Sequence, residues 1–518
     1  MFDLKVARGL LVDGSGRPAA PADVGVTGST IADVGDLARA EARVTLDASG
    51  KIVCPGFIDV HSHSDAYLLI EPSAPSKIFQ GVTTEVVGNC GASAAPRLGA
   101  AQQASDWSAQ AYPGTWQTMQ AYRDLLASIG PAVNVVPLVG HNILRASVMG
   151  YAGRVATADE VQAMAALLEQ SLDEGGRGLS TGLAYPPGLF AGREEILALA
   201  AVVGRRGGLY ASHMRSEGRH LVEAIVETLQ VGRATRARIQ ISHLKTSGRP
   251  NWPLLEPALA HIAQARREGV SVAADRYPYT SSCTELDVIF PDWAEAGGRA
   301  AVLQRLRDPV TRRRLRDELV AAKAADYWDI VTIGSTGARN RHFQGLPLRQ
   351  VAAQLGLEPV DAVLYLTDTD DLTTSAFFQG MSETNMWRIL AEPWVMLGSD
   401  ASVRAPWGPL SQDYPHPRAY GSFPRFLRAA LDGRTVPLAE AICKMTSLPA
   451  QQFGLRDRGR IARDQAADIV VFDPNTVADR ATYAAPHQLA TGIEAVVVNG
   501  VVTLTDGRLS GDRAGRVL

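Results

Sequence analysis

Six side chains of the types that bind metal ions stand at or just after the ends of short apolar runs. They are His61, His63, Cys90, His213, His243 and Asp400. Neutral imidazole and thiolate are the donors that zinc prefers, and a carboxylate can both bind the ion and carry a proton. Water at an open position on zinc has a pKa of about 7, so hydroxide is available at neutral pH. These residue types therefore indicate metal-assisted hydrolysis.

The pair His61-x-His63 is the most compact part of this set. Alternate side chains of a strand share one face, so two imidazoles at this spacing turn to the same side and can bind one ion. An isolated histidine or cysteine is more often a structural residue. We therefore expect structural roles for the remaining isolated candidates, which are His141, His261, His487, Cys54, Cys283 and Cys443.

Eight short apolar runs supply the strands that must position these side chains. They span residues 57–60, 82–87, 133–139, 178–182, 208–212, 238–242, 270–274 and 394–398. Helical patterns separate most of them, and the clearest covers 158–174, with Thr157 and Glu160 forming a capping box. Alternating strands and helices predict an α/β protein with a parallel sheet. Eight such strands indicate a (β/α)8 TIM-type barrel, with an open doubly wound sheet as the alternative.

In such a barrel the carboxyl ends of all strands meet on one face, where active sites are built. The six candidate ligands follow five different strands, so they are expected on that face together.

Residues 1–54 and 436–518 have the pattern of short strands with turns. We therefore expect the two termini to form one small β-sandwich domain beside a barrel of residues 55–435. An excursion at about 284–350, including a further strand at 329–333, is expected to be an inserted lid segment.

Composition excludes several classes of protein. The chain has 518 residues, a formal net charge of −3 and 46% hydrophobic residues, which is typical of a globular protein without a nucleic acid or an anionic membrane as partner. No apolar stretch approaches the roughly 20 residues that cross a bilayer, and the start of the chain lacks a signal-peptide pattern. Four cysteines make no disulfide framework. We expect a cytoplasmic protein with a small-molecule substrate, and the oligomeric state is left open.

Two motifs of serine enzymes are present but stand in the wrong context. Residues 178–182 match G-x-S-x-G, yet Pro186 and Pro187 follow, where a nucleophile elbow requires a helix. Residues 242–245 match S-x-x-K, but this segment ends a strand instead of beginning a helix. Both matches are interpreted as coincidental.

The stretch from Pro55 to His63 resembles the opening of the amidohydrolase superfamily, and Asp464 to Asp473 resembles its C-terminal β-sandwich strand. Further segments resemble the N-acyl-D-amino-acid deacylases (D-aminoacylases) within that superfamily. These segments are 80–84, 88–91, 242–245, 277–279, 398–400 and 416–421. The specific element is Asn89-Cys90-Gly91, because these deacylases use a cysteine where most two-metal relatives use a carboxylated lysine.

This resemblance implies zinc-dependent hydrolysis of N-acyl-D-amino acids to a carboxylate and a D-amino acid. Cys90, His213 and His243 would hold a tight zinc, and His61, His63, Cys90 and Asp400 would form a weaker second site. Asp400 would be the catalytic general base, taking a proton from the attacking water and passing it to the leaving amine. The positions that the family uses to hold its substrate match Tyr185, Lys245, Tyr277, Ser282 and Arg418.

The chain departs from the family at two places that border the expected pocket. Residues 403–409 are additional in the loop after Asp400, and Cys283 stands where the family usually has serine. The preferred side chain and acyl group of the substrate therefore stay open. Two other interpretations also stay open. One is a different substrate, either a cyclic amide, as in hydantoinases and dihydropyrimidinases, or another amide. The other is an inactive barrel that serves as a binding or assembly module.

Overall fold

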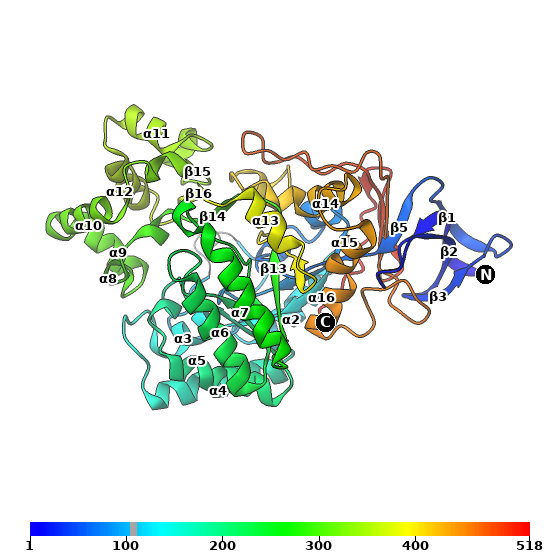
Figure 1. Ribbon diagram of the computed structural model, residues 1–518, viewed down its shortest axis with the longest axis horizontal. Helices are drawn as coiled ribbons and strands as arrows, with labels where there is room; N and C mark the ends of the chain where they lie inside the picture. Colours follow the sequence, from blue (N-terminus) through cyan, green and yellow to red (C-terminus); the bar gives the residue numbers. More distant parts are fainter. Residues whose placement is uncertain (104–110) are drawn as a thin grey trace.

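Eight parallel strands form the centre of the computed structural model, which describes residues 1–103 and 111–518 (Figure 1). Each predicted apolar run overlaps one of them, with the third run divided in two. The strands are β6 (Phe57–Asp59), β7 (Val82–Val87), β8 (Asn134–Pro137) with β9 (Val139–Gly140), β10 (Gly178–Gly182), β11 (Leu209–His213), β12 (Arg238–Ile241), β13 (Val272–Arg276) and β17 (Val395–Leu397).

The sheet closes on itself. Strands β6, β7 and β8 form one arc, and β9, β10, β11, β12, β13 and β17 form the other, with parallel pairing throughout both. Leu138 joins the arcs at β8 and β9, where its N–H donates to the carbonyl of Val87 at 2.9 Å. At the other seam Ser62 bridges Ala401 in parallel, and the Asp400 N–H donates to the His61 carbonyl at 2.7 Å. The predicted barrel is thus confirmed, and the alternative of an open doubly wound sheet does not apply.

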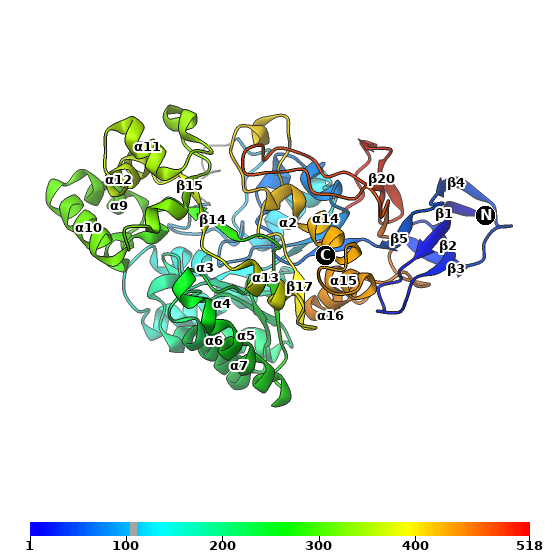
Figure 2. The same cartoon turned by 45° about the horizontal axis from the view of Figure 1, so that its top comes forward.

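Helices cover the outside of the barrel, and α4 to α7 lie side by side in Figures 1 and 2. The helix α4 begins after Thr157 with the predicted capping box, and its Met164 and Leu168 are buried in the main core. The helices between barrel strands, with α14 after β17, are α1 (Pro75–Ile78), α2 (Met119–Ile129), α3 (His141–Met149), α4 (Ala158–Asp173), α5 (Arg193–Arg205), α6 (Leu221–Thr235), α7 (Leu255–Arg267), α13 (Glu383–Leu390) and α14 (Arg418–Leu431).

A separate unit leaves the barrel between β13 and β17 (Figure 1, left). Its antiparallel strands β14 (Ser281–Glu285), β15 (Val331–Ile333) and β16 (Ser375–Gln379) form a sheet of their own. Its helices are α8 (Asp292–Glu295), α9 (Arg299–Arg307), α10 (Pro309–Ala322), α11 (Leu348–Leu355) and α12 (Pro359–Thr369). It has its own hydrophobic core. The predicted strand at 329–333 is β15, and the unit extends beyond residue 350 as far as β16.

The two ends of the chain share one nine-stranded sheet, so they form one β-domain together, as predicted. Its strands are β1 (Phe2–Leu11), β2 (Ala20–Thr27), β3 (Thr30–Gly35), β4 (Ala42–Asp47), β5 (Ile52–Pro55), β18 (Ile469–Phe472), β19 (Ile493–Val498), β20 (Val501–Thr505) and β21 (Arg508–Leu509). Strand β5 joins the two ends because it pairs with both β1 and β18. Helices α15 (Leu438–Met445) and α16 (Ser447–Phe453) contact barrel strand β6, although they lie in the expected C-terminal part of the β-domain. The boundaries at 54/55 and 435/436 stay predictions.

No helix among the described residues is long and apolar enough to cross a lipid bilayer.

A fully buried lysine stabilises the closing seam. The ammonium of Lys77 on α1 lies 2.8 Å from Asp59 Oδ2 and 3.0 Å from Glu85 Oε1. It also donates to Ser399 Oγ at 3.0 Å and to the Ala401 carbonyl at 2.9 Å. Burial would lower the pKa of Lys77, but Asp59 and Glu85 raise it, so the ammonium stays charged. One charge thus ties β6 and β7 to the segment after β17.

We expect Lys77→Met to destabilise the protein by about 3–5 kcal/mol, because two buried carboxylates lose their common cation. The midpoint of denaturant unfolding measures this loss. The matched control is Arg314→Met, which removes one partner of an exposed pair with Glu318 on α10 and should shift the midpoint little. Equal shifts for the two variants would contradict the role given to Lys77.

Candidate functional site: a thiolate-centred metal centre

The six predicted ligands converge at the carboxyl ends of the barrel strands. Cys90 belongs to two groups whose donor atoms all lie within 4.8 Å of one another. One group joins it to His61, His63 and Asp400, and the other joins it to His213 and His243. Its Sγ lies 3.2 Å from His61 Nε2 and 3.5 Å from His243 Nε2. A single sulfur therefore stands between two possible ion positions.

Three of the ligands sit in the left-handed backbone region that residues other than glycine rarely adopt. The φ angles are 52° for Cys90, 35° for His243 and 53° for Asp400. Each residue comes directly after a strand or within three residues of its end, where the chain turns inward. Such conformations cost free energy and cluster at functional sites. Here they turn the side chains toward the barrel axis.

The surroundings of Cys90 favour the thiolate. Burial alone would raise the pKa of its thiol, but the imidazoles of His61 and His243, and a hydrogen bond with His213, hold it well below the ordinary value. The other cysteine at this end of the barrel behaves differently, since burial raises the pKa of Cys283 to about 11. Thiolate is the form that binds a metal ion.

Two carboxylates that the sequence analysis missed orient the histidines. Asp275 Oδ1 accepts from His61 Nδ1 at 2.9 Å and from the His243 backbone N–H at 2.8 Å. Glu217 Oε1 lies 2.7 Å from His243 Nδ1. Both contacts leave Nε2 of the imidazole for the ion, which is the usual arrangement of a ligand histidine and a supporting carboxylate. Asp275 lies at the end of β13, so the strand-end rule could have found it, whereas Glu217 lies in an irregular loop that gives no such signal.

Asp400 lies between the ligand set and a buried arginine. Its Oδ1 is 3.1 Å from His63 Nε2 and 3.4 Å from His61 Nε2, and its Oδ2 accepts from Arg418 Nη1 at 2.6 Å. Burial would raise the pKa of Asp400, but the Arg418 guanidinium and the nearby imidazoles hold it well below its ordinary value. It is therefore a carboxylate, able to accept a proton.

Four of the five predicted substrate-binding residues line this centre. Arg418 Nη2 donates to the Cys283 carbonyl at 3.2 Å, and the guanidinium lies 4.7 Å from the centre of the Tyr277 ring. Lys245 Nζ lies 2.8 Å from His243 Nδ1 and also pairs with Glu217. The Tyr185 ring lies edge-on to His213, with 4.7 Å between their centres.

The fifth predicted substrate residue, Ser282, lies half-buried in β14 opposite Phe378. Among residues 1–103 and 111–518, Ser282 makes no contact with the six candidate ligands. Its role stays a prediction.

The additional loop of residues 403–409 folds back on the segment after β6. The Val403 N–H donates to Ser64 Oγ at 2.8 Å, and Arg404 pairs with Asp413 at 2.5 Å.

The serine of the G-x-S-x-G match has a structural role. Ser180 is fully buried, its Oγ accepts from the Gly91 N–H at 3.1 Å, and it donates to the Gly88 carbonyl. It thus fixes the turn that carries Cys90. His141 likewise serves the scaffold, since its Nε2 lies 2.7 Å from Glu195 Oε1 away from the ligands.

The donor set suits a divalent transition metal ion. It combines one thiolate, four imidazoles and a carboxylate. Nδ1 of His213 is buried and has no hydrogen-bond partner within the described residues, as expected of a ring that is positioned for something besides a protein contact. The residues present therefore fit a metal ion.

Comparison with known proteins decides the family. Residues 44–504 match the amidohydrolase family. The chain belongs to this family. It is 38% identical over 526 aligned residues to the D-aminoacylase of Alcaligenes xylosoxydans xylosoxydans, covering 100% of this chain and 97% of that protein. The predicted relationship to the N-acyl-D-amino-acid deacylases is thereby confirmed.

Solved structures agree with the fold of this amidohydrolase. The N-acyl-D-glutamate deacylase of Bordetella bronchiseptica, complexed with zinc and a phosphonate inhibitor, superposes with a TM-score of 0.86 at 36% identity, covering 100% of this chain and 99% of that one. The L-hydantoinase of Arthrobacter aurescens has a TM-score of 0.60 at 16% identity, covering 100% of this chain and 99% of that one. The second likeness shows a shared fold alone.

If Cys90 joins the two ion positions, Cys90→Ala should lower the metal content to less than half of that in the unchanged protein, because both groups lose a donor. Elemental analysis of the purified protein measures metal per chain. Cys443→Ala is the matched control, since that thiol lies outside both ligand groups and donates to the Gly14 carbonyl at 3.1 Å. Unchanged metal content in Cys90→Ala would remove the thiolate from the centre.

Proposed function

We propose that this amidohydrolase hydrolyses the amide bond of N-acyl-D-amino acids and uses zinc. The observation that carries the proposal is the thiolate of Cys90, shared by two ligand groups in a chain that is similar over its whole length to D-aminoacylase. The zinc-complexed N-acyl-D-glutamate deacylase, also similar over the whole chain, supports the choice of metal.

Cys90, His213 and His243 are the residues that would hold the tight zinc, and His61, His63, Cys90 and Asp400 would form the weaker second position. Bound zinc supplies a Lewis acid that polarises the scissile carbonyl and lowers the pKa of water. The supporting carboxylates of Asp275 and Glu217 keep the imidazoles of His61 and His243 turned toward the ion.

Asp400 is the proposed general base. Water attacks the amide carbon while the Asp400 carboxylate accepts one of its protons, so a C–O bond forms. The same carboxyl then gives this proton to the amide nitrogen as the C–N bond breaks. Asp400 is then ionised again. The second proton of the water leaves the new carboxyl group for the freed amine, so the products are a carboxylate and an ammonium group. Its position beside the imidazoles of both His61 and His63 supports this role.

Arg418 is proposed to bind the α-carboxylate of the substrate. Its guanidinium is 5% exposed and stacks on Tyr277, so it is held in place before the substrate arrives. A planar guanidinium can bind both oxygens of a carboxylate, and a buried site makes such pairs strong. Lys245, Tyr185, Tyr277 and Ser282 are proposed to complete the substrate site.

A cyclic amide is the alternative substrate. The likeness to L-hydantoinase supports only the fold, and a buried guanidinium beside Asp400 suits a free carboxylate better than an uncharged ring. The preferred amino-acid side chain of the substrate stays open, because the similar proteins include one named for D-glutamate.

A cytoplasmic location also stays a prediction. It is supported by four free thiols, which a reducing compartment preserves.

The zinc-loaded protein should turn over N-acetyl-D-methionine and N-acetyl-D-glutamate, or one of them, at least about 100-fold faster than the L-isomers and hydantoin. Initial rates at equal substrate concentrations measure this preference. Hydantoin as the fastest substrate would replace the proposed activity by that of a cyclic amidase.

Asp400→Ala should lower kcat by roughly 10²–10⁴-fold while zinc stays bound, because Cys90, His213 and His243 remain. Parallel measurements of kcat and of zinc per chain separate the two roles of the carboxylate. Asp432→Ala, at an exposed position after α14, is the control and should change neither quantity. Loss of zinc together with activity would show that Asp400 is chiefly a ligand.

A further inference from the structure

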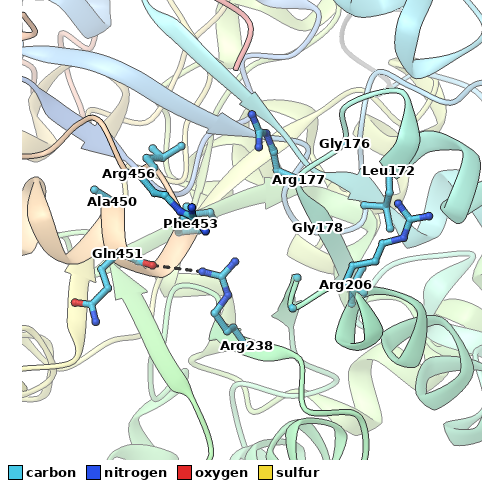
Figure 3. Close-up of a pocket in the computed structure, with 15 residues that line it drawn as sticks. Leu172, Gly176, Arg177, Gly178, Arg206, Arg238, Ala450, Gln451, Phe453 and Arg456 are labelled. Carbon is cyan, nitrogen blue, oxygen red and sulfur yellow. Dashed lines mark hydrogen bonds between the residues drawn. The ribbon is translucent and has the colours of Figure 1, made fainter. Parts of the chain in front are cut away.

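A second cavity opens at the opposite end of the barrel from the metal ligands. It has a volume of about 740 Å³, and the barrel strands begin at its wall: Gly178 starts β10, Gly208 precedes β11 and Arg238 starts β12. The opposite wall consists of the end of α16 and the residues that follow it, including Phe453 and Arg456 (Figure 3). Substrate bound at the metal centre cannot occupy this cavity.

The lining of this cavity is strongly basic. It includes Arg177, Arg206, Arg238 and Arg456, and none of its residues is an aspartate or glutamate. Arg206 pairs with Asp173 at 2.6 Å just outside the cavity. The other three arginines have no carboxylate partner among residues 1–103 and 111–518. The whole chain carries a formal charge of −3, so this concentration of positive charge is local.

Arg238 is the most constrained of the four. Its Nη1 donates to the carbonyls of Gln451 at 3.3 Å and Gln452 at 2.7 Å, which orients the guanidinium (Figure 3 draws the first of these bonds). Its Nε is buried and has no partner in the described part of the chain. Burial lowers the pKa of Arg238, and no acid opposes this effect. A positioned guanidinium with an unused donor and no counter-charge is suited to an anion.

Apart from Gln451, the rest of the lining is apolar or lacks side chains. Leu172, Val203, Phe453 and Leu455 supply apolar surface. Four glycines, at positions 176, 178, 207 and 208, leave only backbone on the side of β10 and β11. A ligand that matches both features carries an oxyanion at one end and an apolar body at the other.

We propose that this cavity binds a small organic oxyanion, a carboxylate or phosphate group on an apolar body, independently of the catalytic centre. The guanidinium groups of Arg177, Arg238 and Arg456 bind the oxygens, and Phe453 with Leu455 contacts the body. The site lies against the ends of three barrel strands whose other ends carry His213, His243 and the turn at Gly182. Occupancy therefore stabilises the folded barrel.

Isothermal titration calorimetry of the zinc-loaded protein tests the proposal, with phenyl phosphate and phenylacetate as probes at constant ionic strength. The variant Arg177→Gln/Arg456→Gln removes two exposed arginines without a partner in the described residues. The control Arg39→Gln/Arg313→Gln removes the same charge from exposed positions elsewhere. We expect one probe to bind the unchanged protein and the control with equal Kd, and the cavity variant at least about tenfold more weakly.

The unfolding midpoint and the rate with N-acyl-D-amino acids should be the same in the cavity variant and the control, which separates this site from the catalytic one. If the double variant is poorly folded, Arg456→Gln alone carries the same comparison. If the cavity variant binds only phenyl phosphate more weakly, the cavity is a phosphate site. If it binds only phenylacetate more weakly, the cavity is a carboxylate site. Equal binding in all three proteins, or no binding of either probe, overturns the proposal.

Discussion

The arrangement depends on one buried thiolate. Cys90 lies 3.2 Å from one imidazole and 3.5 Å from another, and its negative charge is tolerable inside the protein only because cationic partners surround it. The imidazoles of His61 and His243 provide part of that compensation, since they hold the pKa of the Cys90 thiol well below its ordinary value against the effect of burial. A divalent cation would provide it more completely and would leave the imidazoles neutral.

The scaffold around the thiolate consists largely of buried ionic contacts. Asp275 contacts both His61 and the backbone of His243, and thereby links two ligands from different strands. Lys77 connects Asp59 and Glu85, on the neighbouring strands β6 and β7, to Ser399 and Ala401 across the seam where the barrel closes. Ser180 fixes the turn at Gly88 and Gly91 on either side of Cys90. Each contact removes a degree of freedom from a ligand, so that the metal centre is formed before an ion or a substrate binds.

Much of this could be predicted from the sequence, since the eight strands carry short apolar runs and the ligands follow their ends. The capping box at Thr157 and Glu160 also defined the start of α4 correctly. Closure of the barrel could not be derived from periodicity, because it depends on contacts such as Ser62 with Ala401 that are far apart in sequence. The inserted unit extends to β16 because strand Ser375–Gln379 pairs with both β14 and β15.

The functional site, like the fold, could be predicted only in part. Residue type and strand position were sufficient to select the six side chains that converge at the barrel rim, whereas Glu217 was missed because it lies in a loop and contacts His243 and Lys245. The arginines of the second cavity also gave no signal, since they begin strands or follow helices and resemble ordinary surface residues in the sequence. Only the folded chain shows that no acid lines their cavity.

The most direct test of the metal centre is the activity of the unchanged protein after exhaustive chelation, followed by titration with zinc and elemental analysis at each step. The account predicts that activity disappears with the metal and returns in full at about one zinc per chain, the occupancy of the tight site. Full activity in protein that retains no transition metal would contradict it.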